Sequence, residues 1–177
     1  MTNIMDKKEL KKKLLENHKS FIQFVIGLPS DEFSKSNNEK WTAGQQLEHI
    51  FLGVKPVRQI LSLPKFLIKL ICGQANRKSK NYDELVKKYQ HKLENGGRAT
   101  GRFIPKSVDI DRGQKLTTKL TNEVEKLCAK LDKYSESELD KYILPHPLLG
   151  KLTLREMLFF TIYHVEHHEE LTKRNLK

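Results

Sequence analysis

Residues 154–171 read LREMLFFTIYHVEHHEEL, a helical pattern that carries three histidines within five positions. Successive residues of an α-helix are about 100° apart, so His164 and His168 lie roughly 40° apart on one face. The same face carries the apolar residues Met157, Phe160 and Leu171. Both histidines are therefore predicted to point into the protein.

The charged residues of this helix are predicted to face water on the opposite side: Arg155, Glu166, Glu169 and Lys173. His167 lies on the shoulder between the two faces. Two histidines one turn apart can present ring nitrogens to one point, which suits two ligands of a first-row metal. A hydrogen-bonded pair of core histidines is the alternative interpretation. HVEHH also lacks the HExxH order, which argues against a zincin-type protease.

A third ligand would have to come from another helix, and His49 in GQQLEHIFLG is the candidate. It stands at the edge of the apolar face of its helix, where a side chain can turn toward a cavity. Glu48 beside it either supports a ligand or acts as a base, or it is a solvated glutamate. His18, His91 and His146 lie in polar or linker surroundings and are expected to be solvent-exposed, with His146 the nearest of them to the last helix.

Apolar residues recur at helical spacing in most of the remaining chain. The expected helices cover residues 6–27, 42–63, 64–73, 82–93, 109–134 and the chain from 152 or 153 onward. Thr42 is a predicted N-cap, with Gln45 completing a capping box. Trp41 is predicted to be a staple or core residue, not a platform for substrate. Pro56 predicts a kink or an early end of its helix.

These patterns predict one all-α domain over residues 1–177, an up-down four-helix bundle with one long crossover connection. No alternating strand of convincing length appears, and residues 135–151 are expected to form a linker. Residues 74–105 are polar and basic, as is typical of a lid or a surface excursion. This positive segment is predicted to guard the open end of the site and to attract an anionic thiol or substrate, and neutralising Arg98 and Arg102 together would test this.

The composition limits the classes of partner. The chain has 33 lysines and arginines against 22 acidic residues, a formal net charge of +11. It lacks an RNA-binding aromatic motif, a zinc finger or a helix-turn-helix, so a solvated basic face is expected and specific nucleic-acid binding is not. No segment is apolar for about 18 residues, so no membrane span is expected. Cys72 and Cys128 have no CxxC spacing and are expected to be buried thiols, which favours a cytoplasmic location.

Two segments resemble the DinB/YfiT-like superfamily of small helical proteins: WTAGQQLEHI at residues 41–50 and HPLLGKLTLREMLFFTIYHVEHHEEL at residues 146–171. The most specific part is HPLLGKLT followed by HxxxH. Residues 79–106 are also similar to crossover segments in one branch of that superfamily. The resemblance implies a four-helix bundle in which three histidines hold a metal, and carried over by residue these are His49, His164 and His168.

Characterised members of that superfamily include S-transferases that use bacillithiol or a similar low-molecular-weight thiol, and a mycothiol-dependent isomerase. The resemblance therefore implies a divalent metal, zinc ahead of nickel, manganese or iron, with a thiol as co-substrate and a small electrophile as substrate. Hydrolysis is the related outcome, and a non-catalytic metal-binding bundle that serves as a stress-linked interaction module is the alternative. Glu169, Glu170 and Leu171 depart from one common family pattern, which leaves the thiol, the substrate and the catalytic residues open. Bundles of this kind often pair, so a homodimer is one expected assembly.

Overall fold

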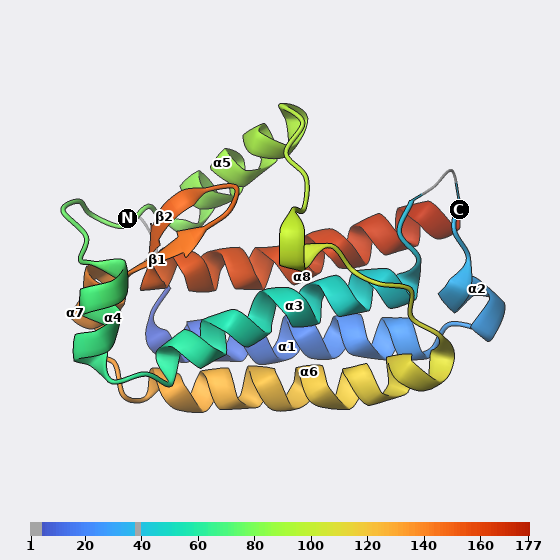
Figure 1. The fold of residues 1–177 in the computed structure, drawn as a ribbon, viewed down its shortest axis with the longest axis horizontal. Coiled ribbons are helices and arrows are strands. Elements are labelled where there is room, and N and C mark those ends of the chain that lie inside the picture. Colours follow the sequence, from blue (N-terminus) through green and yellow to red (C-terminus); the bar gives the residue numbers. More distant parts are fainter. Residues whose placement is uncertain (1–4, 38–39) are drawn as a thin grey trace.

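The computed structural model describes residues 5–37 and 40–177, and four long helices form its core (Figure 1). They are α1 (Lys7–Ile26), α3 (Ala43–Leu61), α6 (Ile110–Leu131) and α8 (Leu154–Leu176). Each helix follows a stretch of apolar residues at helical spacing, and these residues form one continuous core between the helices. The prediction of an all-α four-helix bundle is confirmed.

The directions of the helices explain the long crossover. Arg112 near the start of α6 pairs with Glu48 early in α3, whereas Glu123 farther along α6 pairs with Arg58 near the end of α3. α3 and α6 are therefore parallel, and Figure 1 shows α1 and α8 running the opposite way. After α3, a helix of 19 residues, the chain must return along the bundle by about 28 Å before α6 can begin. Residues 62–109 make this return, so the predicted single crossover is present.

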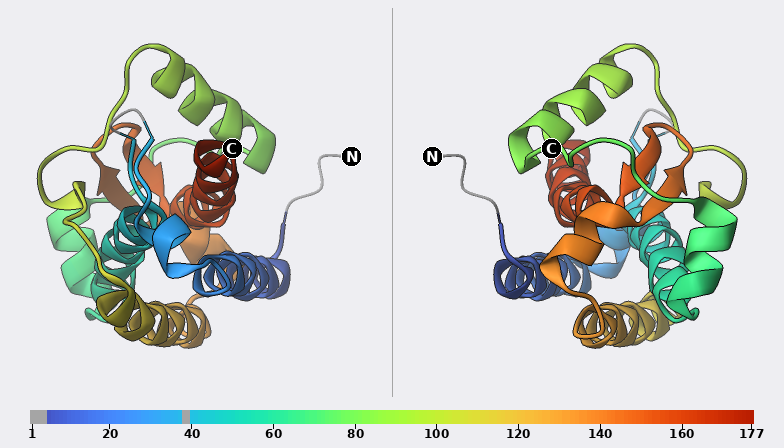
Figure 2. Two further views of the ribbon diagram at one scale, coloured as in Figure 1. Left: turned by 90° about the vertical axis from the view of Figure 1, so that its right-hand side faces the viewer. Right: turned by 90° about the vertical axis from the view of Figure 1, so that its left-hand side faces the viewer.

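Three helical pieces lie in the crossover: α4 (Lys65–Cys72), α5 (Tyr82–Glu94) and the 3-10 helix η1 (Gly101–Phe103). The end-on views of Figure 2 show α5 outside the four-helix core, next to α8. α5 begins at a capping box formed by Asn81 and Glu84. The crossover therefore covers one side of the bundle along α8.

A β-hairpin replaces much of the expected linker before α8. Its strands β1 (Ile143–His146) and β2 (Gly150–Thr153) are antiparallel, and Leu144 pairs with Leu152. Each strand has four residues, and Pro145 and Gly150 are typical of turns, so the sequence pattern did not reveal them.

Two short helices also lie in segments expected to be irregular. They are α2 (Ser30–Ser34), which follows α1, and α7 (Glu136–Lys141), which precedes the hairpin. The backbone N–H of Glu138 bonds to the Ser135 hydroxyl in a capping box that starts α7. Helices of five and six residues span too few turns for a periodic pattern to show.

The predicted start of α3 is confirmed. The backbone N–H of Gln45 donates to Oγ1 of Thr42, and the backbone N–H of Thr42 donates to Oε1 of Gln45, which is the expected capping box. Trp41 does not act as a staple, because the residue that it would contact, one turn into the helix, is the polar Gln46. Pro56 lies inside α3 without ending it.

α8 is enclosed by other elements along its N-terminal half, since α1, α3, α5, α7 and the hairpin all pack against it. Arg155 is only 4% exposed, so the prediction that it faces water was wrong. Its guanidinium pairs with Glu136 and Asp140. Glu156 is fully buried and accepts two hydrogen bonds, of 2.6 and 2.7 Å, from Arg77 of the crossover.

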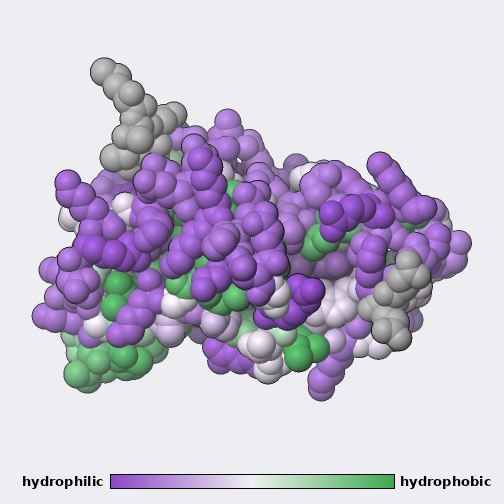
Figure 3. Space-filling model, turned by 90° about the horizontal axis from the view of Figure 1, so that it is seen from above, coloured by the Kyte–Doolittle hydropathy of each residue, from purple (hydrophilic) through white to green (hydrophobic). Residues whose placement is uncertain are grey.

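The surface above α5 and the hairpin is largely hydrophilic (Figure 3). A hydrophobic patch stands at its lower left, where α4 exposes Phe66, Leu70 and Ile71. Among residues 5–37 and 40–177, no helix is both long and apolar enough to cross a membrane.

Replacing Arg77 by alanine is expected to lower the free energy of unfolding by about 2 kcal/mol, because Glu156 then stays buried without the two hydrogen bonds from the guanidinium and keeps only Lys80, at 3.8 Å, as a counterion. The value lies below that of a fully enclosed pair because the Arg77 side chain is 38% exposed and water can partly replace it. Urea unfolding at pH 7 measures the difference. The matched control is Arg98→Ala, which removes an exposed arginine and is expected to change stability by less than about 0.5 kcal/mol.

The same variant makes a prediction about pH. Burial by itself raises the pKa of Glu156, but hydrogen bonds from Arg77 and from the backbone N–H groups of Lys80 and Thr153 outweigh burial and lower the pKa. A depressed pKa in the folded state contributes stability above the unfolded pKa of about 4.3, and this contribution is lost as the pH falls. The gap between the native protein and Arg77→Ala should therefore narrow below about pH 4. A gap that stays constant from pH 7 to pH 3.5 would contradict this account.

Candidate metal centre

Three histidine rings converge where α3 packs against α8: His49 from α3, and His164 and His168 from α8. Nε2 of His164 lies 3.2 Å from Nε2 of His49 and 3.0 Å from Nε2 of His168. Nitrogens that bind one zinc ion tetrahedrally are about 3.3 Å apart. The three nitrogens therefore lie close enough together to hold a metal ion.

The outer nitrogens of two of these rings have partners that determine which nitrogen carries hydrogen. Nδ1 of His49 lies 2.7 Å from the carbonyl oxygen of Phe103, and Nδ1 of His168 lies 2.5 Å from Oε1 of Gln46. An amide oxygen only accepts hydrogen bonds, so each Nδ1 must donate. Nε2 of both rings therefore presents a lone pair to the centre of the cluster.

Nε2 of His164 stands between these two lone pairs. A neutral ring can donate only one hydrogen there, so a lone pair of His49 or of His168 would be left facing another nitrogen at about 3 Å. A cation at the centre satisfies all three nitrogens at once. Three imidazoles are also a ligand set that suits zinc and similar divalent ions and leaves a coordination position open. The arrangement therefore fits a metal.

Burial keeps the three rings in the form that binds a metal. It lowers the pKa of His49, and the hydrogen bond to the Phe103 carbonyl only partly opposes this. Burial, with the neighbouring histidines adding to it, lowers the pKa of His164 and of His168 well below 6.5. All three rings are thus neutral near pH 7, and a neutral imidazole has the free lone pair that a metal requires.

A cavity of about 650 Å³ opens onto the three rings. Its floor lies on α3 and α8, where the ring of Phe160 stacks on His164 with 4.6 Å between the ring centroids. Residues 97–103 of the crossover and residues 144–148 of the hairpin form the walls. Tyr89 and Leu93 of α5 also line the cavity, and the ring of Tyr89 lies 6.1 Å from that of His164.

Glu48 supports this wall and does not bond to the neighbouring histidine. It is buried, with hydrogen bonds from the backbone N–H of Lys106 and from the guanidinium of Arg112. The interpretation of Glu48 as a solvated glutamate was therefore wrong. Its carboxylate ties α3 to the chain just after Phe103, whose carbonyl orients His49.

Two further residues that the sequence singled out lie in the cavity wall. His167 is half-buried, with its ring edge-on to His168 at 5.2 Å, and it is not part of the three-nitrogen cluster. The ring of Trp41 lies 4.9 Å from His49 and is stacked near His168 at 6.3 Å. Trp41 is thus half-buried in the wall of the cavity and is not a core residue as predicted.

The remaining histidines divide between confirmation and correction. His91 is exposed, as predicted. His18 was expected to be exposed but is buried, because it lies on the inner face of α1 and its Nδ1 hydrogen bonds to the carbonyl of Leu14. His146 is half-buried and lies against the last helix, with its ring 4.2 Å from that of Phe160.

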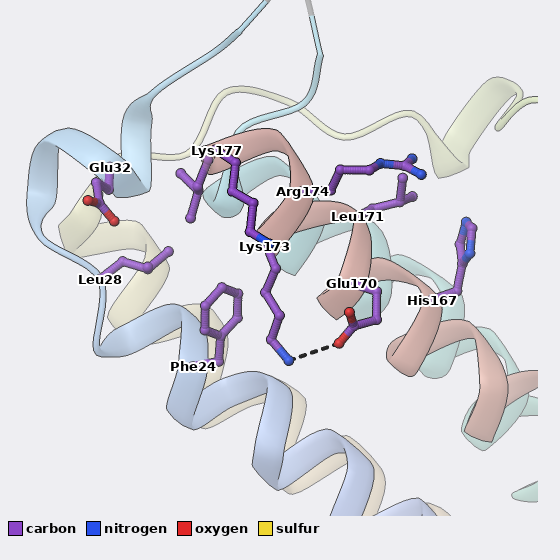
Figure 4. A pocket seen from close by; sticks show the side chains of 10 residues that line it. Phe24, Leu28, Glu32, His167, Glu170, Leu171, Lys173, Arg174 and Lys177 are labelled. Carbon is purple, nitrogen blue, oxygen red and sulfur yellow. Dashed lines mark hydrogen bonds and ion pairs between the residues drawn. The ribbon is translucent and has the colours of Figure 1, made fainter.

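A second hollow of about 640 Å³ lies between α1, α2 and the end of α8 (Figure 4). Of its charged side chains, Lys173 pairs with Glu170 at 2.9 Å. It contains a single histidine, His167, at its edge. This hollow therefore offers no comparable set of ligands.

Sequence reasoning missed the two groups that orient the ligand rings. Gln46 lies three residues before His49 on the same face of α3, and this spacing was a signal that could have identified it. The Phe103 carbonyl had no such signal, because every residue carries a carbonyl and only the path of the crossover brings this one to His49. Sequence spacing could thus have predicted the side chain that orients a ligand ring, but it could not have predicted the backbone carbonyl.

Comparison with known proteins agrees with this geometry. A family model of the DinB superfamily matches residues 13–171. That match spans most of all four bundle helices and includes the three converging histidines. Searches of curated proteins and of solved structures found no match. Because the family model covers nearly the whole length of the sequence, the chain belongs to the DinB superfamily.

Proposed function

We propose that this protein is a metal-dependent enzyme that transfers a low-molecular-weight thiol of the bacillithiol type to a small electrophile, with hydrolysis as the related reaction. The observation that supports it is the convergence of three imidazole lone pairs on the floor of an open cavity. His49, His164 and His168 are the proposed ligands, and zinc is the proposed metal, ahead of nickel, manganese or iron.

Different residues of the chain would orient the ligand rings of such a site. Gln46 and the Phe103 carbonyl hold two of the ligand rings in the correct tautomer. The third ring, His164, is held between Phe160 and its two neighbours. A divalent ion bound here supplies an open coordination position and lowers the pKa of a thiol that enters it. In the transfer, the thiol sulfur bonds to the electrophilic carbon, the leaving group departs with its electron pair, and the thiol proton passes to solvent.

The lining of the cavity favours thiol transfer over hydrolysis. Among the described residues that line it, none is an aspartate or a glutamate. Glu48, the nearest candidate for a base in the sequence, is occupied by Lys106 and Arg112. Hydrolysis at three-histidine or related zinc sites commonly relies on a carboxylate that manages protons, whereas a thiol already ionised needs less help.

The first prediction for the centre concerns its stoichiometry. Protein purified without an affinity tag is expected to bind about one divalent ion per chain, and His164→Ala or His49→Ala should lose it because two rings alone bind weakly. Elemental analysis measures the content, and thermal unfolding with and without added zinc measures the linked stabilisation. The control is His91→Ala, an exposed histidine outside the cluster, which should bind normally.

His49→Ala gives the clearest contrary result. Full occupancy together with a lowered unfolding temperature would mean that His49 only packs, and the three-histidine site would then be wrong. Loss of metal with an intact helical spectrum is the expected result, because His49 lies at the margin of the cavity and removal of its ring takes little from the apolar core.

Gln46 provides a second prediction. Gln46→Leu keeps the size of the side chain but removes the acceptor for Nδ1 of His168, so metal affinity should fall about 10- to 100-fold. Competition with a chromogenic chelator measures the affinity. Gln59→Leu is the matched control, because it makes the same change at an exposed position of the same helix. Equal affinities of the two variants would show that Gln46 does not orient the ligand.

Catalysis itself is tested by consumption of two reagents. Zinc-loaded protein is expected to consume a small thiol and a generic alkylating electrophile in equal amounts, faster than the uncatalysed reaction, and His49→Ala or metal removal should abolish this. Product is measured by chromatography and free thiol by a colorimetric reagent. Normal metal binding without consumption of thiol would favour the non-catalytic metal-binding bundle.

A further inference from the structure

The seven arginines of the chain fall into two groups. Four pair with carboxylates: Arg58, Arg77, Arg112 and Arg155. The other three have no carboxylate within ion-pair distance among residues 5–37 and 40–177: Arg98, Arg102 and Arg174. All three of these line the cavity above the histidine cluster, and Lys40 joins them there. Within the part of the chain that the structure describes, the guanidinium groups without a carboxylate partner therefore all line one cavity.

The end of the same cavity nearer the start of α8 is apolar. Its lining there comes from α8, from the second half of α3 and from the hairpin: Met157, Phe160, Val57, Ile60, Leu144 and Leu148. Gly53 belongs to the same floor, and a side chain at this position would lie 3.8 Å from Nδ1 of His164. The absence of a side chain at Gly53 leaves room beside the cluster on this apolar side.

The helix spacing places the proposed metal between the two ends. Met157 precedes His164 by seven residues and Arg174 follows it by ten, which corresponds to about 10 Å and about 15 Å along α8 in opposite directions. Arg102 stands in the wall between them, with its guanidinium 5.1 Å from the ring centre of Phe103, the residue whose carbonyl bonds to His49. Along the cavity, the apolar side chains thus come first, the histidines with Arg102 in the wall beside them come next, and Arg174 comes last. Gly97, the residue before Arg98, lies against Leu148 of the hairpin.

We propose that the cavity binds an anionic small molecule with an apolar body, holding the anionic group against Arg98 and Arg102 of the wall and the body against the apolar side chains of α3 and α8. This inference rests on the proposed function for its reaction, in which the anionic partner would be the thiol and the apolar partner the electrophile. The binding itself requires only the cavity. Guanidinium groups bind carboxylate, sulfonate and phosphate oxygens through charge-assisted hydrogen bonds, and each apolar carbon that enters adds affinity.

Trp41 makes the proposal measurable without turnover. It is the only tryptophan of the chain and it lines the cavity, so its fluorescence reports on what binds there. Zinc-loaded protein is titrated with 1-octanesulfonate, ethanesulfonate and 1-octanol, since sulfonates coordinate metals weakly and their affinity reflects the arginines. Octanesulfonate should bind about tenfold more tightly than octanol because of the charge-assisted contacts, and at least about tenfold more tightly than ethanesulfonate because of its longer chain.

The variants separate a local site from general positive charge. Arg98→Gln with Arg102→Gln should weaken octanesulfonate about tenfold at low salt and leave octanol unchanged, and the difference should shrink as salt is added. Lys115→Gln with Lys119→Gln removes the same charge from exposed positions on α6, on the far side of the bundle, and should change neither affinity.

Each contrary result removes a defined part of the proposal. Octanol binding as tightly as octanesulfonate, or arginine variants that bind like the native protein, would make the cationic rim an ordinary solvated surface. Ethanesulfonate binding as tightly as octanesulfonate would remove the apolar end. Selective binding of octanesulfonate without consumption of any thiol would retain this binding site and overturn the proposed transferase reaction, so the two failures are distinguishable.

Discussion

Enclosure of α8 is the constraint on which the rest of this structure depends. A helix that is covered on most sides must provide a partner for each polar group it carries, because an unpaired buried group costs about 1–3 kcal/mol and a buried charge costs more. Arg155 finds Glu136 and Asp140 on α7, and Glu156 finds Arg77 on the crossover. The elements outside the four-helix core therefore serve as counterions for its most buried helix.

The same constraint applied more than two turns farther along α8 leads to the metal centre. Nδ1 of His168 donates a hydrogen bond to Gln46. Nε2 of His164, however, faces the lone pairs of two other rings, and no arrangement of hydrogens on three neutral imidazoles satisfies all three nitrogens. Charging the rings is opposed by burial, which lowers the pKa of each. The polar group that the protein does not satisfy by itself is thus the one that a divalent ion satisfies.

The crossover connects these two regions because its length follows from topology. α3 and α6 run parallel, so a long return segment was unavoidable, and its route takes it over the open side of the cluster. The Glu48 contacts with Lys106 and Arg112 fix the end of that route beside the start of α6. A segment required for chain connectivity thereby supplies the Phe103 carbonyl and one wall of the cavity.

The limits of sequence reasoning follow from the same features. Helical periodicity located the four bundle helices and the inward direction of His164 and His168, because burial of one face is a local property of a helix. The assumption of a single buried face then failed at Arg155, since the elements that cover the other face come from distant parts of the chain. The hairpin was missed for a related reason, because its two short strands pack against α4, α7 and α8, which come from distant or irregular parts of the sequence pattern.

The distribution of positive charge in the structure also differs from what the composition suggests. A net charge of +11 read from the composition suggests a diffuse basic surface, and much of it is carried by exposed lysines. The arginines do not follow this distribution, since four are neutralised by carboxylates and the remaining three stand around one cavity. An arginine without a carboxylate presents five donors in a rigid fork that matches an anion, whereas a lysine presents a mobile point charge. Selectivity for an anionic ligand would thus come from where the guanidinium groups stand and not from the total charge, which is why exposed lysines elsewhere are the relevant comparison.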